Sequence, residues 1–577
     1  MSNHTIQHDW REHCKVGVRK FLMNAVVIDN EPRLPILDNS HATGQQTATP
    51  VDDGMGGVAH TVQDMAEETS GVQLEDHSLD ITSLSDSFAD QGIACAFVFP
   101  KDGDDDETKS TRVLKAVATS DLVIIDWYLS KKSPLLTRKL LTKIASKDAA
   151  EKGRMRLICV YTGQPEVADV TRLAIESLKK GNLNFNVEDI DAGFAQGPHH
   201  LLVVLNKKQK SAQALPEYLI NEFTKLADGL LPVFALSAVA AIRKNVHHIA
   251  ARFSAELDPA YVANRLITDP PHDITELMRE LFISECDSAL GLEKVSDLNL
   301  EPEHIKLWLD AKNQPKNEQE DNGFKVDRMF LHGLNYGRVC DKEAILNIHN
   351  PSEDITRQKL NAKKRGLISL ALQDSEDAGL RRVNTERRFA RLVSFKREMY
   401  GENKLSSDHG WQPTLTLGSI IKLYPKLEAS SNSDSQEIQP EYFYCLTPLC
   451  DTVRLYGNKQ KFIFLRLESG RSKKVSLLLE EKGKSEPTKL CFEPTPSNIE
   501  VFCFIGDLKL GRVLATKNMS TDELLFTDTE ENSFEWLGEV RISRAMRDMA
   551  ELNRTWLRFG INDSEYLRLA SRGEVDI

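Results

Sequence analysis

Short apolar runs rich in β-branched residues recur in the first third of the chain, and each ends at a polar residue. The runs at 26–28, 122–125, 157–161 and 201–205 lead into Asp29, Asp126, Thr162 and the sequence Asn206-Lys207-Lys208, respectively. Such runs, separated by helical stretches, predict buried parallel strands. The carboxyl ends of parallel strands meet at one edge of a sheet, so acids, a hydroxyl and an amine are expected to lie together there.

The stretches between these runs complete an alternating pattern. Residues 81–92 and 166–180 have helical spacing, and 94–99 predicts one more strand. A second strand-like stretch at 183–187 competes with 201–205 for the position of the last parallel strand.

Two segments stand apart from this pattern. Residues 1–20 predict a short N-terminal helix. Residues 34–80 are rich in Thr, Gly, Asp, Gln and Ser and have few large apolar side chains. Such a segment cannot bury enough surface to offset its ordering entropy, so it predicts a mobile insertion within a domain of residues 21–210.

The rest of the chain changes character twice. Residues 211–312 have helical spacing almost throughout and predict a helical domain that could form a homodimer. Residues 313–400 predict a polar linker followed by a basic helical region, in which Arg387, Arg388 and Arg391 share a face. Residues 401–577 predict an α+β domain. Its strand-like runs are 415–423, 442–446, 453–455, 462–467, 475–479 and 501–505, and its last long helix is 541–558.

Composition bounds the class of protein. A chain of 577 residues exceeds what one hydrophobic core serves, and its 41% hydrophobic and 28% charged residues are ordinary for a soluble protein. The formal net charge of -13 argues against nucleic-acid binding by the whole surface. No apolar run approaches the roughly 18 residues that cross a bilayer. The polar N-terminus and nine scattered cysteines suit a cytoplasmic protein without membrane contact.

The four strand ends resemble the receiver domain of two-component response regulators, over roughly residues 21–210. This resemblance implies a flavodoxin-like, doubly wound parallel α/β sheet. It implies that Asp126 is the phospho-acceptor and that Asp29, Asn30 and Asp126 hold Mg²⁺. It further implies that Thr162 follows the phosphoryl group and that Lys207 pairs with it.

These residue types suit that chemistry. A carboxylate can attack phosphorus and form an acyl phosphate. Mg²⁺ prefers hard oxygen ligands and is usually held by one or two carboxylates together with water and phosphate. A lysine ammonium is a mobile point charge for phosphoryl oxygens, and a threonine hydroxyl can donate a hydrogen bond to one of them.

Departures from the receiver pattern leave questions open. Asn30 replaces an acid that many receivers carry, which removes one negative charge from the metal site. No proline follows the lysine, and Lys208 competes with Lys207 for the pocket. An alternative hypothesis is therefore a pseudo-receiver scaffold that takes up no phosphate.

The motif at Thr447–Arg454 extends the resemblance to the receiver-only component of Detocs-type antiphage two-component systems. This implies a phosphorelay partner, a histidine kinase that donates phosphate, and a role as a phosphate sink that protects an effector protein from accidental activation. The chain has no P-loop, kinase ATP lid, zinc-protease or serine-hydrolase motif, so no enzymatic activity is expected beyond self-phosphorylation and autodephosphorylation of the aspartate. A further alternative is a phosphorylation-controlled effector that binds nucleic acid through the region Arg381–Arg397 and loses this binding when Arg387, Arg388 and Arg391 are replaced.

Overall fold

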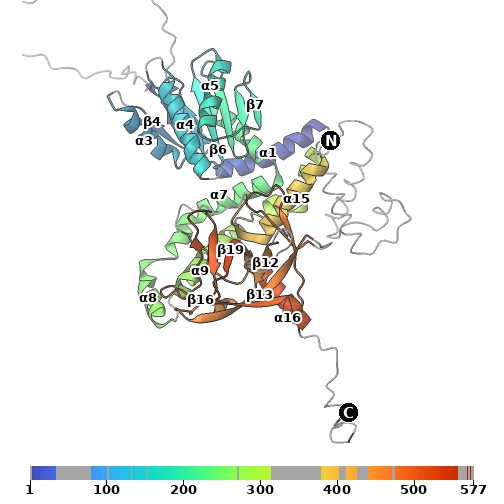
Figure 1. Cartoon of the computed structure of the whole chain (residues 1–577). Helices are drawn as coiled ribbons and strands as arrows, with labels where there is room; N and C mark the ends of the chain where they lie inside the picture. Colours follow the sequence, from blue (N-terminus) through green and yellow to red (C-terminus); the bar gives the residue numbers. More distant parts are fainter. Residues whose placement is uncertain are drawn as a thin grey trace, which may run out of the picture. The chain divides into compact units, whose positions relative to one another are not determined.

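The computed structural model describes most of the chain as two compact units (Figure 1). The described residues are 3–30, 32–33, 79–100, 103–130, 133–151, 154–268, 272–312, 378–401, 411–424, 439–470, 475–556, 568 and 572. Unit 1 comprises Met1–Arg252 and Ser284–Asp341, and unit 2 comprises Phe253–Ile283 and Lys342–Ile577. The finer division expected from the sequence, with boundaries at 20, 210, 312 and 400, stays a prediction.

Unit 1 is built around a seven-stranded sheet with the order β4-β1-β5-β6-β9-β8-β7. Its strands are β1 (Asn24–Ile28), β4 (Ala94–Val98), β5 (Leu122–Ile125), β6 (Arg156–Thr162), β7 (Val187–Asp189), β8 (Phe194–Gln196) and β9 (His200–Asn206). The five strands from β4 to β9 are parallel, and all residues of β5, β6 and β9 are buried. This arrangement confirms the predicted flavodoxin-like, doubly wound sheet.

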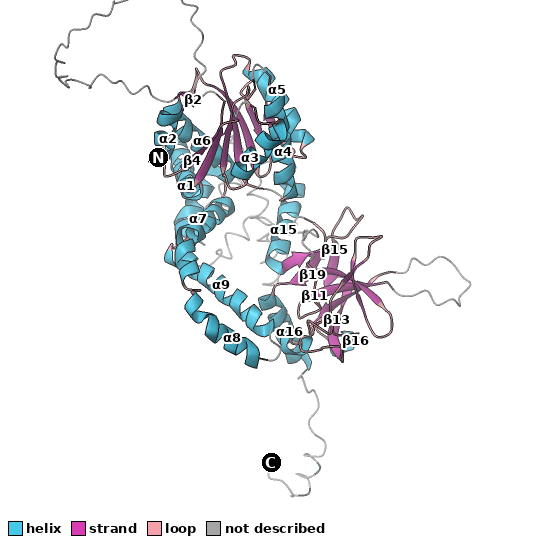
Figure 2. Ribbon diagram, turned by 90° about the vertical axis from the view of Figure 1, so that its left-hand side faces the viewer, coloured by secondary structure: helices cyan, strands magenta, loops and turns pink. Residues whose placement is uncertain are grey.

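Helices cover both faces of this sheet (Figure 2). The helices of this part are α1 (Asn3–Phe21), α2 (Ile81–Asp90), α3 (Asp106–Val117), α4 (Leu135–Ala150), α5 (Val167–Lys180), α6 (Leu215–Phe223) and α7 (Leu230–Ala251), with short 3-10 turns η1 (Ala212–Ala214) and η2 (Thr224–Ala227). One core joins the sheet to α1, α2, α6 and α7, and the other joins it to α3, α4 and α5. The alternation of side chains along each strand supplies both cores.

The N-terminal helix α1 is fastened to elements that lie far along the chain. The indole of Trp10 donates to Asp228 Oδ1 at 2.8 Å, and Arg19 Nη2 donates to Glu217 Oε2 at 2.9 Å. Its apolar side chains Trp10, Cys14 and Val18 are buried in the first core. Helix α1 is therefore an integral layer of unit 1.

A short hairpin extends the sheet beyond its parallel strands. Strand β8 pairs antiparallel with β9, and β7 pairs antiparallel with β8. The last parallel strand is thus β9, and the alternative that placed it at 183–187 is wrong. Only Leu183 in that stretch is fully buried, whereas β9 is buried along its whole length.

The predicted insertion at 34–80 lies, except for its last two residues, outside the described residues. Its flanks are described. β2 (Pro32–Arg33) and β3 (Leu79–Asp80) form a two-stranded parallel pair. The pair brings the two ends of the segment together shortly after Asp29 and Asn30.

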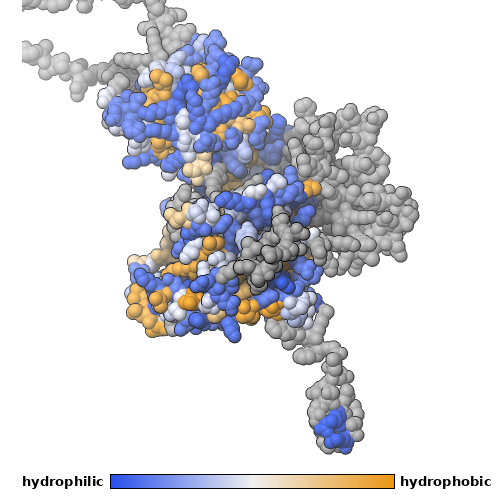
Figure 3. Space-filling view, viewed as in Figure 1, coloured by the Kyte–Doolittle hydropathy of each residue, from blue (hydrophilic) through white to orange (hydrophobic). Residues whose placement is uncertain are grey.

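The helical region that follows the sheet continues to residue 312. It contains η3 (Ala255–Leu257), α8 (Asp258–Ile267), α9 (His272–Leu292), α10 (Asp297–Leu300) and α11 (Pro302–Lys312). Helix α8 has no buried residue, and Val262, Leu266 and Ile267 contribute to the apolar surface at α8 (Figure 3). Within the described parts of the chain, no helix is both long enough and apolar enough to cross a bilayer.

Unit 2 contains a ten-stranded antiparallel sheet, of which eight strands follow the order β14-β15-β13-β12-β11-β19-β18-β17. Strand β10 also pairs with β19, and β16 pairs with β13. The elements are α15 (Ala378–Ser394), β10 (Phe395–Glu398), β11 (Ser419–Leu423), β12 (Glu441–Cys445), η5 (Leu449–Thr452), β13 (Lys459–Ser469), β14 (Leu477–Leu479), β15 (Thr488–Cys491), η6 (Pro496–Asn498), β16 (Ile499–Ile505), β17 (Thr516–Lys517), β18 (Leu524–Thr527), β19 (Ser533–Val540) and α16 (Ile542–Trp556). A C-terminal sheet domain after a helical region confirms the predicted order of fold classes.

Alternating residues of the sheet in unit 2 supply two cores. Tyr442 and Tyr444 lie in the core that also contains Ala545 and Leu552 of α16. Phe443 lies in the other core, which holds a cluster of phenylalanine rings in edge-to-face and tilted contacts. The strand predicted at 453–455 is wrong, because Arg454 has a φ of 66° and the segment forms a loop.

Candidate functional site

The parallel strands of unit 1 deliver polar residues to one edge of the sheet. Asp29 follows β1 and Asp126 follows β5, and Ile28 and Ile125, the residues before them, are paired in register. Thr162 and Asn206 are the last residues of β6 and β9 and are paired with each other, and Lys207 comes next. The alignment of four strand ends therefore brings these side chains to the same edge, as the hydrophobic pattern predicts.

Lys207 bridges the two aspartates. Its Nζ lies 2.9 Å from Asp29 Oδ2 and 3.0 Å from Asp126 Oδ1. Asp29 is 2% exposed, and the side chains of Asp126 and Lys207 are 12% and 11% exposed. The cluster is therefore largely withdrawn from water, while Asp126 retains an accessible part. Lys208 is the neighbour whose backbone N–H donates to Asn206 Oδ1 at 2.8 Å.

Backbone and side-chain contacts hold Asp126 from several sides. Its backbone N–H donates to Ile28 O at 2.9 Å, and its backbone carbonyl accepts from the Thr137 hydroxyl at 3.0 Å. Its Oδ2 accepts from the backbone N–H of Tyr128 at 2.8 Å. Oδ1 faces the ammonium of Lys207, so the two carboxylate oxygens have different environments.

Burial and charge act against each other at Asp126. Burial raises the pKa of its carboxyl above the ordinary value, the nearby Lys207 ammonium opposes this shift, and the Asp29 carboxylate adds to it. For Lys207, burial lowers the pKa, but the two carboxylates outweigh it and the net shift is upward. Lys207 therefore stays protonated, and Asp126 is easier to protonate than an exposed aspartate.

Thr162 ends β6, and the loop that follows it is bonded to the loop of Lys207. The Thr162 side chain is buried, its carbonyl accepts from Lys207 N at 2.8 Å, and its Oγ1 accepts from the backbone N–H of Gln164 at 3.2 Å. The Asn206 amide donates to Gln164 O at 2.7 Å. Movement of either loop must therefore be accommodated by the other.

Three contacts at this edge went unnoticed in the sequence. They come from the Tyr128 N–H, the Thr137 hydroxyl and the Asn206 amide. Asn206 could have been found, since it ends a buried apolar run directly before Lys207. Tyr128 donates from its backbone N–H, and the Thr137 hydroxyl donates to the backbone carbonyl of Asp126. Bonds that involve the backbone cannot be predicted from the pattern of residue types.

The donor set is suited to Mg²⁺. Two carboxylates, Asp29 and Asp126, lie close enough to share one ammonium, and the half-buried Asn30 follows Asp29. Mg²⁺ is usually held by one or two carboxylates with water and phosphate completing the shell. Among the described residues no group of three or more His, Cys, Asp or Glu side chains could hold a metal ion, and Glu31 is not among them. The carboxylates of Asp29 and Asp126 are thus the groups that would hold Mg²⁺, with water and phosphate completing its shell.

The arginines of the alternative nucleic-acid hypothesis are engaged within unit 2. Arg387 Nη2 lies 2.8 Å from Glu486 Oε2. Arg391 is 6% exposed and forms ion pairs with Glu398 at 3.0 Å and Glu480 at 2.8 Å. A phosphate group that bound Arg387 or Arg391 would have to displace these carboxylates, and the buried Arg391 ties α15 to Glu398 and Glu480.

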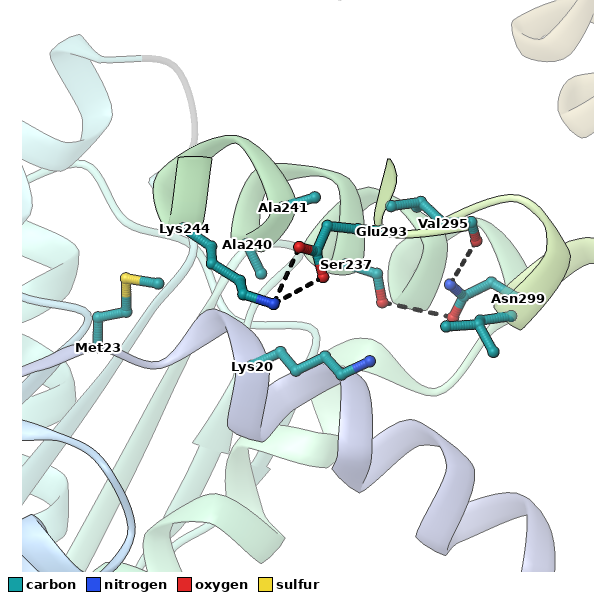
Figure 4. A pocket seen from close by; sticks show the side chains of 10 residues that line it. Lys20, Met23, Ser237, Ala240, Ala241, Lys244, Glu293, Val295 and Asn299 are labelled. Atoms are coloured by element: carbon teal, nitrogen blue, oxygen red, sulfur yellow. Dashed lines mark hydrogen bonds and ion pairs between the residues drawn. The ribbon is translucent and has the colours of Figure 1, made fainter. Parts of the chain in front are cut away.

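A separate cavity of about 270 Å³ lies among α1, α7 and the segment 293–299 (Figure 4). Lys244 and Glu293 form an ion pair at its rim, and Ser237 donates to Asn299 Oδ1 at 3.4 Å in its wall. The cavity is lined by none of the residues Asp29, Asp126, Thr162 and Lys207. The cavity is therefore distinct from the cluster around Lys207.

Comparison with known families agrees with this geometry. Residues 21–212, about a third of the chain, match the family described as the response receiver domain. Neither the curated proteins nor the solved structures contain a match. The chain therefore carries a receiver domain of the kind used in two-component systems, which in general accepts phosphoryl groups from histidine kinases.

Proposed function

We propose that this protein accepts a phosphoryl group on Asp126 from a partner histidine kinase and signals without an enzymatic output domain. The observation that carries the proposal is the Lys207 ammonium, 2.9 Å from Asp29 and 3.0 Å from Asp126 at the carboxyl edge of the sheet. A single cation between two buried acids can shift from the Asp126 carboxylate to an incoming phosphoryl group. The receiver match over residues 21–212 supports the same chemistry.

The reaction requires an ionised Asp126. One carboxylate oxygen forms a new bond to phosphorus while the bond from phosphorus to the donor breaks, and the donor leaves with that electron pair. Lys207 stays protonated and neutralises charge on the phosphoryl oxygens. The Thr162 hydroxyl donates to one of these oxygens, which couples the modification to the position of its loop.

Asp29, Asn30 and Asp126 would hold Mg²⁺ in this reaction. The ion supplies neutralisation of the negative charge that builds on the phosphoryl oxygens during transfer. Asp29 contributes a fixed, fully buried carboxylate. Asn30 contributes at most a neutral oxygen, so the site carries one negative charge fewer than an all-acid pair.

The finer proposal concerns the biological role. The protein would act in the cytoplasm as a phosphate sink in antiphage defence, drawing phosphoryl groups away from a kinase whose effector would otherwise be activated. Support comes from the resemblance of Thr447–Arg454 and of the acidic edge to the receiver-only component of Detocs-type systems. The helical region 211–312 would offer a surface for a homodimer. Binding of nucleic acid is disfavoured, because Arg387 and Arg391 are already paired.

Intact-mass analysis of the full chain tests the proposal. We expect incubation with acetyl phosphate and Mg²⁺ to add one phosphoryl group to the wild type and none to Asp126→Asn, and EDTA to suppress the addition. A slowly released group on the wild type would support the sink, whereas rapid release would favour a transient relay.

The pseudo-receiver hypothesis predicts the opposite result. The wild type would then remain unmodified even when a cognate kinase is supplied, and the lost charge at Asn30 would be the physical reason. Asn30→Asp is the matched variant for that case. Phosphoryl uptake by this variant alone would overturn the proposal for the natural chain.

A further inference from the structure

Asn206 joins the two loops that carry the proposed phosphoryl contacts. Its side chain is 5% exposed; Nδ2 donates to Gln164 O at 2.7 Å, and Oδ1 accepts from Lys208 N at 2.8 Å. The amide orientation is fixed, because a flipped amide would place N–H against N–H and oxygen against oxygen. The Asn206 side chain therefore bonds to the Thr162–Gln164 loop through Nδ2 and to the Lys207–Lys208 loop through Oδ1.

The Gln164 end of this link leads directly to the Thr162 hydroxyl. Gln164 gives its N–H to Thr162 Oγ1 at 3.2 Å and receives the Asn206 amide on its carbonyl. Thr162 Oγ1 can accept the Gln164 N–H and still donate its own hydrogen, so this bond alone does not prevent contact with a phosphoryl group. A shift of the segment 162–164 toward Asp126 would instead stretch the bond from the Asn206 amide to Gln164 O. The bond from Asn206 opposes that movement.

A second contact between the loops is independent of Asn206. The Tyr161 hydroxyl donates to Lys210 O at 2.6 Å. Lys207 N also donates to Thr162 O at 2.8 Å. The loops therefore remain joined without the Asn206 amide, so its loss changes the balance between arrangements without releasing the edge of the sheet.

We propose that Asn206 is a positioning residue that holds the Thr162–Gln164 loop in its unphosphorylated arrangement. It thereby sets how readily the Thr162 hydroxyl turns to the phosphoryl group. This inference rests on the proposed function of Asp126. It adds a residue that acts through Thr162 and that does not contact the reacting atoms.

The test measures the affinity of the full chain for beryllium fluoride with Mg²⁺, a non-covalent mimic of the phosphoryl group. Trp127, buried beside Asp126, provides a fluorescence signal. Asn206→Ala is expected to bind the mimic about fivefold more tightly, the effect of one lost hydrogen bond that had favoured the unbound arrangement. Thr171→Ala, which removes a buried hydroxyl bonded within α5, is the matched control and should leave the affinity unchanged.

A double-mutant cycle separates positioning from structural damage. In a Thr162→Ala background, Asn206→Ala should no longer change the affinity, because the group through which it acts is gone. Asn206→Asp gives a second cycle if Asn206→Ala does not fold. It keeps the acceptor for Lys208 N but loses the donor to Gln164, and the effect of its added charge is common to both backgrounds.

Each result has a distinct meaning. Tighter binding that depends on Thr162 supports the inference. An unchanged or weaker affinity, equal in both backgrounds, overturns it while leaving the proposed function intact. If the wild type itself does not bind the mimic, the proposed function fails and this inference fails with it.

Discussion

Each unit of the molecule buries a lysine between two carboxylates, and the two clusters can be compared group by group. In unit 1 Lys207 lies between Asp29 and Asp126, and in unit 2 Lys422 lies between Glu481 and Glu535. Lys422 is directly opposite Glu535 in the sheet, and both are nearly inaccessible to water. The charges are the same, but the additional hydrogen-bond donors differ.

The carboxylates of unit 2 receive several further donors. Glu481 accepts from Tyr442 OH at 2.8 Å, from Lys484 Nζ at 2.7 Å and from the Thr488 hydroxyl, and Glu535 accepts from Tyr400 OH at 2.6 Å. Burial alone would raise the pKa of Glu481, but these hydrogen bonds and Lys422 lower it to about 2.

At Asp126 the balance is reversed, and burial raises its pKa. The comparison teaches that a lysine between two acids is structural where other donors satisfy the carboxylates. Where fewer donors reach the carboxylate, as at Asp126, the same arrangement suits the phosphoryl transfer that we propose.

The largest effect should follow from breaking the cluster of unit 2. Lys422→Met leaves Glu481 and Glu535 buried without their shared cation, which should cost about 3–5 kcal/mol of unfolding free energy. Hydrogen exchange of peptides from β11 and β19 measures it. Lys484→Met is the matched control, because this lysine is 45% exposed and its loss should cost at most about 1 kcal/mol. Phosphoryl uptake should be unchanged in both variants, and a loss of uptake would contradict the separation of the two roles.

A smaller change is expected from the equivalent substitution in unit 1. Lys207→Met should slow phosphoryl uptake from acetyl phosphate by about 10²-fold, since it removes the preorganised charge for the phosphoryl oxygens. Single-turnover mass analysis gives this rate. Lys208→Met keeps the backbone contact to Asn206 and serves as the control. Equal losses in the two variants would show that general charge, and not the position of Lys207, governs the reaction.

The smallest effect is a difference in response to acid. Asp126 has a raised folded pKa, so its charged form is lost as pH falls through a value above the 3.8 of a free aspartate, and phosphoryl uptake should fall with it. Glu481 has a lowered pKa, so its contribution to stability is present above its unfolded value of 4.5 and is lost only as pH falls through about 2.

A pH series on one sample therefore separates the two clusters. Uptake measured by mass should decline while hydrogen exchange in β11 and β12 stays slow. Lys207→Met should move the decline in uptake to higher pH, because the charge that opposes protonation of Asp126 is gone. Coincident loss of uptake and protection would instead show that acid unfolds the protein as a whole.

The carboxyl edge of unit 1 was predictable because each strand that forms it is a fully buried apolar run ending in one polar residue. The choice between Lys207 and Lys208 was not predictable from the sequence. It depends on the residue at which β9 ends, because adjacent residues of a strand face opposite sides of the sheet. The fifth strand at 200–206 and the competing stretch at 183–187 differ in burial, which a short apolar run does not reveal by itself.

Unit 2 was harder to predict for a physical reason. Strand β19 is buried over most of its length, yet it contains Glu535 and was not recognised as a strand. Its charge is compensated by Lys422 on β11, more than a hundred residues earlier. The loop at 453–455 was mistaken for a strand because positive φ values at Arg454 and Tyr456 belong to residues that ordinarily favour extended backbone.

The packing of α1 has a consequence for the order in which unit 1 folds during synthesis. Trp10 is synthesised before the receiver sheet, but its hydrogen-bond partner Asp228 follows 218 residues later. Contacts of such separation form late, because the intervening loop must close first. Until α6 and α7 are synthesised, the face of the receiver sheet that α1 and α2 cover lacks the rest of its apolar packing, and such partly covered surfaces are prone to aggregation. Helix α1 is thus made before the sheet but completes its packing only after α7.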